Sequence, residues 1–360
     1  NDSLPGMTPI EAFQSADITK YAAINGSQSR IMAINDANKT LWAVGNAEYW
    51  GQLGLNTRDT NYSSPTQVPG TNWRSVYVGV RGGIATKTDG TLWMWGHNEQ
   101  GDLGQGSTTS YSSPVQVGSD TDWASGPRAI SFSSNHTTAI KTDGTMWVWG
   151  ANERGQLGQN NLSEYNSPVQ IPGTTWSKAE ARGRWTIALK TDNTLWSWGY
   201  GAFGKLGLNV PGGGPGAQAS RSSPVQIPGT TWRSFDRHNV HSNADATFAT
   251  KTDGTLWSWG YNENSGVLGQ NDTTRYSSPR QIPGTTWGAA CSVNSFYGAV
   301  MTKTDGTLWG VGQTSLKKAD NSTTWNKFSS PVQIGSGTDW DTSDGRVINS
   351  GSSWISVQSI

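Results

Sequence analysis

The feature that most constrains the fold of this chain is a set of short motifs that recurs in the same order along its length. The consensus copy holds a tryptophan opener, then Lys-Thr-Asp-Gly-Thr, Leu-Trp-x-Trp-Gly, Gly-Gln-Leu-Gly and Ser-Ser-Pro-Val-Gln, and single copies depart from it at one or more of these motifs. The first tryptophan after the Lys-Thr-Asp-Gly-Thr motif recurs every 49 to 61 residues, at Trp42, Trp93, Trp147, Trp196, Trp257 and Trp309. A period of this length, built from short strands and turns, predicts a radial array of β-sheets, the β-propeller.

Each copy is expected to form four strands. In the second copy, residues 71–76 form the opening strand and 84–87 the second, and Asp89-Gly90 supplies the positive-φ positions of a two-residue hairpin turn. The run 92–95 alternates as the third strand, and 113–117 is expected to be an edge strand, where the missing N–H of proline does least harm. Helical periodicity is nearly absent, so the predicted fold class is all-β.

Counting the blades requires both ends of the chain. The segment 338–360 contains an opener at Trp340 and two further strand-like runs, but no Ser-Pro-Val-Gln element. That element is matched at the other terminus by Thr8-Pro9-Ile10-Glu11. We therefore expect seven blades in a single domain, 1–360, the last blade being closed by both termini so that no sheet edge stays open. The predicted repeats lie near 21–70, 71–120, 121–173, 174–229, 230–284 and 285–337, with a composite blade from 338–360 and 1–20.

The spacing of glycines after each Trp-Gly step resembles the RCC1 family, named after the regulator of chromosome condensation. The matching glycines are Gly45 with 51–54, Gly96 with 101–104 (Asp102 replacing Gln), and Gly150 with 155–158, with weaker copies at Gly199 with 204–207 and Gly260 with 266–269. The sixth copy, 311–317, lacks the motif. The resemblance covers essentially the whole chain and implies a seven-bladed RCC1-like β-propeller. It implies less about function, because the family includes nucleotide-exchange factors, enzyme inhibitors and adhesive or structural proteins.

Composition narrows the possible partners. Charged residues make up 14% of the 360 residues, and 26 basic side chains balance 26 acidic ones without a basic or acidic run. This even spread argues against capture of nucleic acid or of an anionic membrane. No apolar stretch of about 18 residues is present, so we expect no membrane insertion. The single Cys291 excludes an internal disulfide framework.

Catalytic and metal-binding interpretations find little support. His238 and His241 with Asp245 would be the candidate metal ligands, but two histidines three residues apart do not share one face of a strand or loop, and no third ligand is implied. The four histidines occupy different repeat positions without a repeated carboxylate partner, so no Ser-His-Asp arrangement is identifiable. We expect no enzyme activity, no cofactor and no metal.

Three of the 20 tryptophans, Trp50, Trp185 and Trp325, lack a packing role that the repeat predicts. Trp185 lies in the most variable part of the repeat, the loop between the opener and the second strand. Equivalent loops of a propeller lie on one face, and arginine with aromatic side chains is the usual composition of binding hot spots. The candidate partner-binding residues are Arg81, Arg184, Trp185, His241, Phe296 and Tyr297. The alternative is that these variable loops are simply solvated, and the sequence leaves both interpretations open.

Two further features are interpreted as structural. A large side chain recurs three residues before the repeated proline, at Tyr62, Tyr111, Tyr165, Arg221, Tyr276 and Phe328. Its regularity favours a cap on the neighbouring blade over an aromatic platform for sugars. An insertion near 200–216 accounts for the longest spacing and is expected to be a surface loop, with a flexible contact arm as the alternative.

These observations favour a non-enzymatic binding or structural module that recognises a protein or glycan partner. Near-identical copies, low charge and a Gly/Ser/Thr/Asn-rich surface fit an extracellular or virion protein, such as a phage tail or appendage or a bacterial surface protein, and fit membership of a larger assembly. The alternative is a regulatory RCC1-like protein that acts on a partner enzyme, as a small-GTPase exchange factor or an enzyme inhibitor. Because the chain begins Asn1-Asp2, we expect a removed leader or a longer product.

Overall fold

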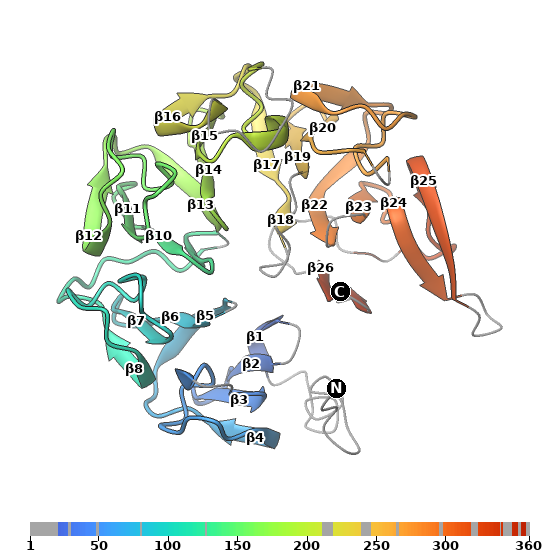
Figure 1. The fold of residues 1–360 in the computed structure, drawn as a ribbon. Coiled ribbons are helices and arrows are strands. Elements are labelled where there is room, and N and C mark those ends of the chain that lie inside the picture. The colour runs from blue at the N-terminus through green and yellow to red at the C-terminus, as the bar shows by residue number, and fades with distance from the viewer. Residues whose placement is uncertain are drawn as a thin grey trace. The chain divides into compact units, whose positions relative to one another are not determined.

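The structure is a computed structural model. It describes residues 21–357 except 28–29, 48–49, 80, 127, 211–218, 239–245, 264–265, 295–297, 318–322, 339, 341–347 and 352–353. The described residues form strands joined by turns and short 3-10 segments, which confirms the all-β class (Figure 1). None of the helical segments in these residues has the length and apolar character needed to cross a membrane. The chain divides into two compact units, Asn1–Arg184 and Trp185–Ile360.

The first unit contains three four-stranded antiparallel sheets, each made of consecutive strands. Their strands are β1 (Tyr21–Ser27), β2 (Arg30–Asn35), β3 (Leu41–Gly45) and β4 (Tyr62–Gln67); β5 (Trp73–Val78), β6 (Gly82–Lys87), β7 (Leu92–Gly96) and β8 (Tyr111–Gln116); and β9 (Ile130–Phe132), β10 (His136–Ile140), β11 (Met146–Gly150) and β12 (Tyr165–Ile171). The unit ends with β13 (Trp176–Arg182). The four strands expected for each repeat are therefore confirmed here.

The second unit continues the same arrangement. Its first strands, in spatial and chain order, are β14 (Trp185–Lys190), β15 (Leu195–Gly199) and β16 (Arg221–Gln226). The next sheet has the order β17 (Trp232–Phe235), β19 (Ala246–Lys251), β20 (Leu256–Gly260), β21 (Tyr276–Ile282). A five-stranded sheet follows, with the order β18 (Arg237–His238), β22 (Trp287–Asn294), β23 (Gly298–Lys303), β24 (Leu308–Lys317), β25 (Thr323–Gln333). A two-stranded sheet is formed by β26 (Ile348–Gly351) and β27 (Trp354–Val357).

The sixth repeat replaces its missing Gly-x-Leu-Gly loop with strand. The strands β24 and β25 continue past the usual end as a long hairpin, in which Gly312 pairs with Phe328 and Lys317 with Thr323. Without the glycines that turn the chain into a tight loop, the third strand simply runs on.

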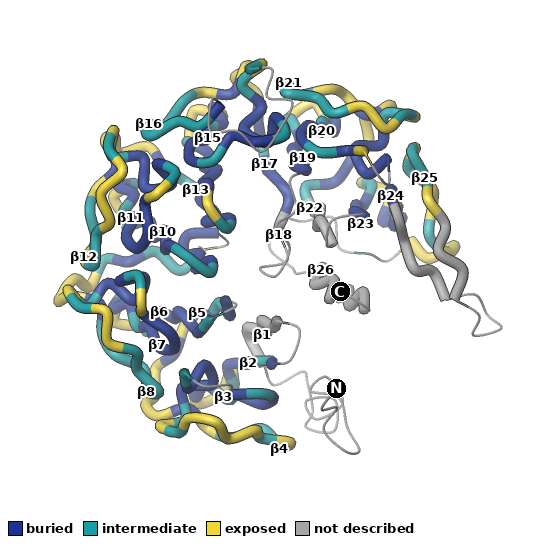
Figure 2. The backbone as a smooth tube through the Cα atoms, viewed as in Figure 1, coloured by how far each residue is buried: buried dark blue, intermediate teal, exposed yellow. Residues whose placement is uncertain are grey.

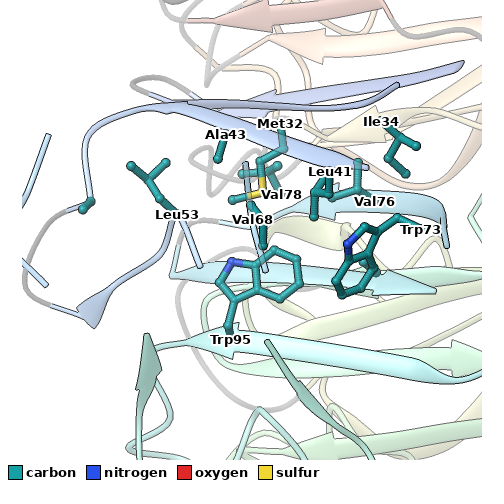
Figure 3. Close-up of a cluster of buried hydrophobic side chains, with 12 residues drawn as sticks. Met32, Ile34, Leu41, Ala43, Leu53, Val68, Trp73, Val76, Val78 and Trp95 are labelled. Atoms are coloured by element: carbon teal, nitrogen blue, oxygen red, sulfur yellow. The ribbon is translucent and has the colours of Figure 1, made fainter. Parts of the chain in front are cut away.

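The core forms between neighbouring sheets, and tryptophan supplies much of its volume. In the first unit, Met32, Leu41 and Leu53 of the first repeat share a cluster with Trp73 and Trp95 of the second (Figure 3). Both indoles are fully buried. The fourth strands β4, β8 and β12 are mostly half-buried or exposed (Figure 2), as expected of edge strands.

The hairpin between the second and third strands differs in type from the expected two-residue turn. In the second repeat, the Gly90 N–H donates to Lys87 O (3.0 Å) and the Lys87 N–H donates to Thr91 O (3.0 Å). Of the turn residues only the glycine has positive φ, 81°, so the loop has three residues, a type I turn followed by a left-handed glycine. The two-residue turn was wrong because Asp89 keeps its φ negative and directs its carboxylate at Thr91. The predicted positive φ itself is confirmed at Gly90, Gly144, Gly254, Gly306 and Asn193.

A side-chain relay fastens this turn to the third strand. Thr91 donates its N–H (3.0 Å) and its hydroxyl (2.6 Å) to Asp89 Oδ1, and the Trp93 indole N–H donates to Thr91 Oγ1 (2.8 Å). The Lys87 ammonium lies 4.0 Å from the centre of the Trp93 ring. The relay recurs from Asp143, Asp192, Asp253 and Asp305, and from Asn38 in the first repeat.

Hydrogen bonds also join each repeat to the next within a unit. The Trp123 N–H donates to Gly90 O (3.1 Å), so the hairpin of one repeat holds the opener of the following one. The Trp95 indole N–H donates to Gln52 O (3.0 Å), which lies in the Gly-Gln-Leu-Gly loop of the preceding repeat. The repeated tryptophans and glycines therefore serve contacts between sheets as well as within them.

Closure of the last blade stays a prediction. The strand expected at Thr8–Glu11 lies outside the described residues. In the last segment β27 matches the strand expected at 353–357, whereas β26 overlaps the strand expected at 346–348 only at Ile348. The extent of a single domain over 1–360 also stays a prediction.

Candidate functional site

The sheets have two different ends, and one of them gathers the variable loops. Antiparallel order places the loop between the first and second strands at the same end as the loop after the third strand. In the second repeat, the His97 N–H donates to Arg81 O (2.9 Å), and in the third, the Ala151 N–H donates to Asn135 O (2.8 Å). We call this the loop end, and the opposite end, with the Asp-Thr-Trp relay, the hairpin end.

The structure describes three of the six predicted partner-binding residues: Arg81, Arg184 and Trp185. Arg81 is half-buried and Arg184 is exposed. Each arginine immediately precedes the second strand of its repeat, so both occupy the loop end. His241, Phe296 and Tyr297 lie outside the described residues.

Trp185 belongs to the core and not to the loop. It pairs with Gly199, which makes it the first residue of β14, the position that His136 holds in the third repeat. Its side chain is 3% exposed and shares a cluster with Ile187 and Trp259. Its assignment to the contact surface is therefore corrected: the loop ends one residue earlier than the sequence suggested, and the first side chain of the strand is packed in the core.

A first cluster lies at the loop end of the second sheet and contains Trp50, Arg81, His97 and Glu99. The Trp50 and His97 rings meet edge to face, with centroids 4.6 Å apart. His97 Nε2 lies 3.1 Å from Glu99 Oε2, and His97 Nδ1 lies 3.4 Å from Arg81 Nη1. The His97 side chain is 2% exposed and that of Glu99 is 74% exposed. The first cluster therefore joins a buried imidazole to partly exposed aromatic and charged groups.

Burial favours the neutral form of this histidine. The pKa of His97 is lowered, first by burial and then by the Arg81 guanidinium, whereas Glu99 raises it. A neutral imidazole has one N–H donor and one acceptor nitrogen. With the proton on Nε2, the ring donates to Glu99 and accepts from Arg81, so both neighbours are satisfied.

A second cluster lies in the second unit and contains Phe203, Tyr261, Glu263 and Arg275. The two aromatic rings meet edge to face, with centroids 5.4 Å apart. The Arg275 guanidinium lies 4.7 Å from the Phe203 ring centre and 5.1 Å from that of Tyr261, and its Nη2 is 2.5 Å from Glu263 Oε2. The arginine is 22% exposed and the glutamate 49%. This arrangement also holds an arginine against aromatic faces near the surface.

The two clusters use equivalent positions of the repeat. Trp50 and Phe203 each precede the first glycine of a Gly-x-Leu-Gly loop, and His97 and Tyr261 each follow the Trp-Gly step of the next repeat. Sequence reasoning identified Trp50 as unexplained but missed its partner, and it missed the second cluster. A comparison of these two loop positions between successive repeats would have found both pairs.

Metal ligation finds no support in the part of the chain that is described. There, no three His, Cys, Asp or Glu side chains are grouped so that they could hold a metal ion. His136 is fully buried, and burial lowers its pKa to about 3, so its ring is neutral. His241 and Asp245 lie outside the described residues.

Three of the regular aromatic side chains before the repeated proline pack as caps. Tyr62, Tyr111 and Tyr276 each lie against a core cluster formed between two sheets. The Tyr276 hydroxyl also donates to Asp272 Oδ2 (2.5 Å), a bond that raises the pKa of this tyrosine. These contacts agree with the structural interpretation of these side chains.

Family models identify the repeats. A model described as the regulator of chromosome condensation (RCC1) repeat matches residues 89–140, 143–188 and 253–293, and a second RCC1 repeat model matches 128–156.

The chain is also similar to curated proteins. It is 30% identical over 165 residues to the Ultraviolet-B receptor UVR8 of Arabidopsis thaliana, and the matched region covers 45% of this chain and 36% of the receptor. It is 32% identical over 142 residues to the human X-linked retinitis pigmentosa GTPase regulator, and the matched region covers 39% of this chain and 14% of that protein. The chain thus spans about a third or less of the length of these relatives.

Solved structures share the fold over most of the chain. Human WBSCR16 superposes with a TM-score of 0.71 at 15% identity, covering 89% of this chain and 83% of that one. Prp20p of Saccharomyces cerevisiae, studied for its binding to Gsp1p and histones, superposes with a TM-score of 0.67 at 16% identity, covering 87% and 76%. This chain therefore contains segments that match the RCC1 repeat, and it has the all-β fold of an RCC1-like β-propeller.

Proposed function

We propose that this protein is a non-enzymatic binding module that recognises a protein partner through the loop ends of its sheets. The observation that carries the proposal is a pair of clusters in which two aromatic rings and a glutamate occupy equivalent repeat positions and an arginine lies beside them. In the first cluster the His97 ring is buried and Glu99 is exposed. Arginine and aromatic side chains dominate binding hot spots because they bury large areas and keep a polar group for orientation. Exposed Arg184 extends this set at the loop end of its own repeat.

The comparisons support a binding role in a general way. The names of similar proteins describe a receptor and a GTPase regulator, and Prp20p was studied for its binding to Gsp1p and histones. A propeller offers many loops on a rigid frame, so different members can bind different partners with the same fold.

The setting of this protein is a finer part of the proposal. An extracellular or virion location, a host-attachment role and a glycan as the alternative ligand rest on the low charge and the Gly/Ser/Thr/Asn-rich composition. The regulatory alternative rests on the GTPase regulator among the relatives. A nucleotide-release assay with small GTPases from the source organism separates the exchange-factor role from the attachment role. Only an exchange factor accelerates the release of bound nucleotide.

The test begins with a photo-crosslinking amino acid placed at Arg81, and at Arg74 as the control. Arg74 is exposed on β5, near the hairpin end of the same sheet. A protein crosslinked from Arg81 and not from Arg74, in extract or on intact particles of the source, is the candidate partner.

Affinity for that partner is then measured with Trp50→Ala, Phe203→Ala and the control Arg74→Ala. We expect each aromatic truncation in a contacting cluster to weaken binding about 30-fold, which corresponds to about 2 kcal/mol. Arg74→Ala should bind as wild type. Unchanged affinity in both aromatic variants, with the fold intact, would move the binding surface away from the loop ends.

A further inference from the structure

Asp102 is the one acidic residue at its position in the repeats. It is the second residue of the Gly-Asp-Leu-Gly loop, where the first and third repeats have Gln52 and Gln156. All three side chains are fully buried. A neutral amide can be buried at moderate cost, whereas a carboxylate loses strong hydration and needs partners.

No other residue among those described donates a hydrogen bond to either oxygen of the Asp102 carboxyl group. Its backbone carbonyl is fixed, because it accepts hydrogen bonds from Thr137 Oγ1 (2.7 Å) and Trp149 Nε1 (2.9 Å). These donors lie on β10 and β11, so Asp102 sits at the junction between the loop of the second repeat and the third sheet. A Cβ placed on Gly150 would lie 3.3 Å from the Asp102 Cβ, which shows how closely the two are packed.

The charges around Asp102 connect it to the first cluster. The backbone N–H of Asp102 itself and then the Arg81 guanidinium favour the ionised carboxylate, and Glu99 opposes it. His97 lies in the same loop, and its pKa is lowered by burial. From the third sheet, β10 contributes neutral His136, while β11 and β12 carry no acidic or basic side chain. No acidic or basic side chain on these three strands therefore offsets a buried negative charge at Asp102.

We propose that Asp102 is a proton-controlled contact: when neutral it allows the loop 97–106 to stay packed on the third sheet, and when ionised it favours opening of that loop. Since this loop carries His97 and Glu99, the same proton sets how often the first cluster is assembled. The inference rests on the proposed function only for its biological role, which is control of partner binding by pH.

The direction of the pH dependence follows from the two states of the loop. Burial raises the pKa of Asp102 to about 7 in the closed state, whereas in an open, hydrated loop it returns toward its usual value. Between about pH 4 and pH 7 Asp102 therefore holds fewer protons in the open state, and this alone raises the open population relative to the closed one by up to about tenfold per pH unit. His97 acts in the opposite sense, because burial lowers its pKa in the closed loop and opening lets it take up a proton as the pH falls. Above pH 7 both states are ionised and the ratio levels off.

Amide hydrogen exchange of the free, full-length protein measures this ratio. After correction for the intrinsic pH dependence of exchange, the opening of 97–106 in the wild type, divided by the opening of the same amides in Asp102→Asn, should increase about 50-fold from pH 5 to pH 7. Asp102→Asn keeps the side-chain shape without a charge, so this ratio cancels the contribution of His97, which both proteins share. Glu153→Gln is the matched control, since Glu153 is exposed at the position in the third repeat that Glu99 holds in the second, and it should keep the wild-type profile.

Equal slopes in the wild type and in Asp102→Asn overturn the proposal. Carbon NMR of the wild-type carboxyl group gives an independent measurement that needs no variant: titration near pH 7 supports the proposal, and titration below pH 5 overturns it. Both measurements are made without a partner, so their failure leaves the proposed binding function intact. Conversely, unchanged affinity in the Trp50→Ala and Phe203→Ala variants would reject that function without affecting the switch.

Discussion

At the scale of single residues, Trp185 and Arg184 are neighbours in the chain with opposite environments. Trp185→Ala removes an indole that is 3% exposed and packed with Ile187 and Trp259, so we expect it to lower the free energy of unfolding by about 3–5 kcal/mol. Arg184→Ala removes an exposed side chain and should change the free energy of unfolding by less than about 0.5 kcal/mol. Denaturant unfolding of both variants measures the difference. Equal stability of the two would return Trp185 to the contact surface.

Gly144 allows a second prediction at this scale. Its φ is 79°, and a Cβ there would overlap the Thr174 carbonyl oxygen of the following repeat. Gly118 is the matched control, because its φ is 59° but a Cβ would meet nothing within 4 Å. We expect Gly118→Ala to cost about 1 kcal/mol through backbone strain alone, and Gly144→Ala to cost at least about 2 kcal/mol more because the turn must move off the next repeat.

The same unfolding measurement compares the two glycine variants. Equal losses would mean that positive φ alone explains the glycine at this turn, as sequence reasoning assumed, and that the contact with the next repeat is not rigid.

At the scale of elements, the Asp-Thr-Trp relay should make the hairpin end sensitive to acid. The hydrogen bond from the Thr91 hydroxyl is the main cause that lowers the pKa of Asp89 in the folded chain. A lowered pKa gives stability that is present above the unfolded value and is lost as pH falls through the folded value. Asp89→Asn, which copies the relay of Asn38 in the first repeat, should therefore lose less stability than the wild type between about pH 4 and pH 2.

Thermal melting across this pH range tests the relay. Asp59→Asn is the control, because Asp59 is an exposed loop residue outside the relay, and it should follow the wild type. An Asp89→Asn variant with the same acid profile as the wild type would show that the hydrogen bonds of the relay do not favour the ionised carboxylate.

The sequence predicted elements well wherever a repeated motif had one local cause. The glycine of each Asp-Gly pair has the expected positive φ, because only that residue adopts the conformation without strain. The turn type was wrong because it depends on where the Asp89 side chain bonds, which the dipeptide does not specify. Trp185 was assigned to the loop because the residue type at this position varies between repeats. The third repeat has His136 where the fourth has Trp185, although both are the first residue of a strand.

The candidate site was less predictable because its contacts join different repeats. Trp50 and His97 are far apart in sequence and meet only when two sheets pack. Arg275 reaches the Phe203 ring in the same way. Such contacts depend on the packing of neighbouring repeats, and no motif within a single repeat specifies them.

At the scale of the whole molecule, the last prediction concerns closure of the seventh blade. A propeller whose last sheet takes its fourth strand from the N-terminal segment has no open edge, and removing that strand exposes unpaired N–H and C=O groups. Deletion of residues 1–13, which contain Thr8–Glu11, should therefore lower the melting temperature and cause aggregation. Deletion of residues 1–6 is the control, since it leaves the Thr8-Pro9-Ile10-Glu11 motif in place and should melt as the full chain does. Light scattering and thermal melting of the three proteins test this prediction. If the chain lacking 1–13 stays monomeric and melts like the full chain, residues 8–11 do not supply the fourth strand, and the last blade must be completed by another segment.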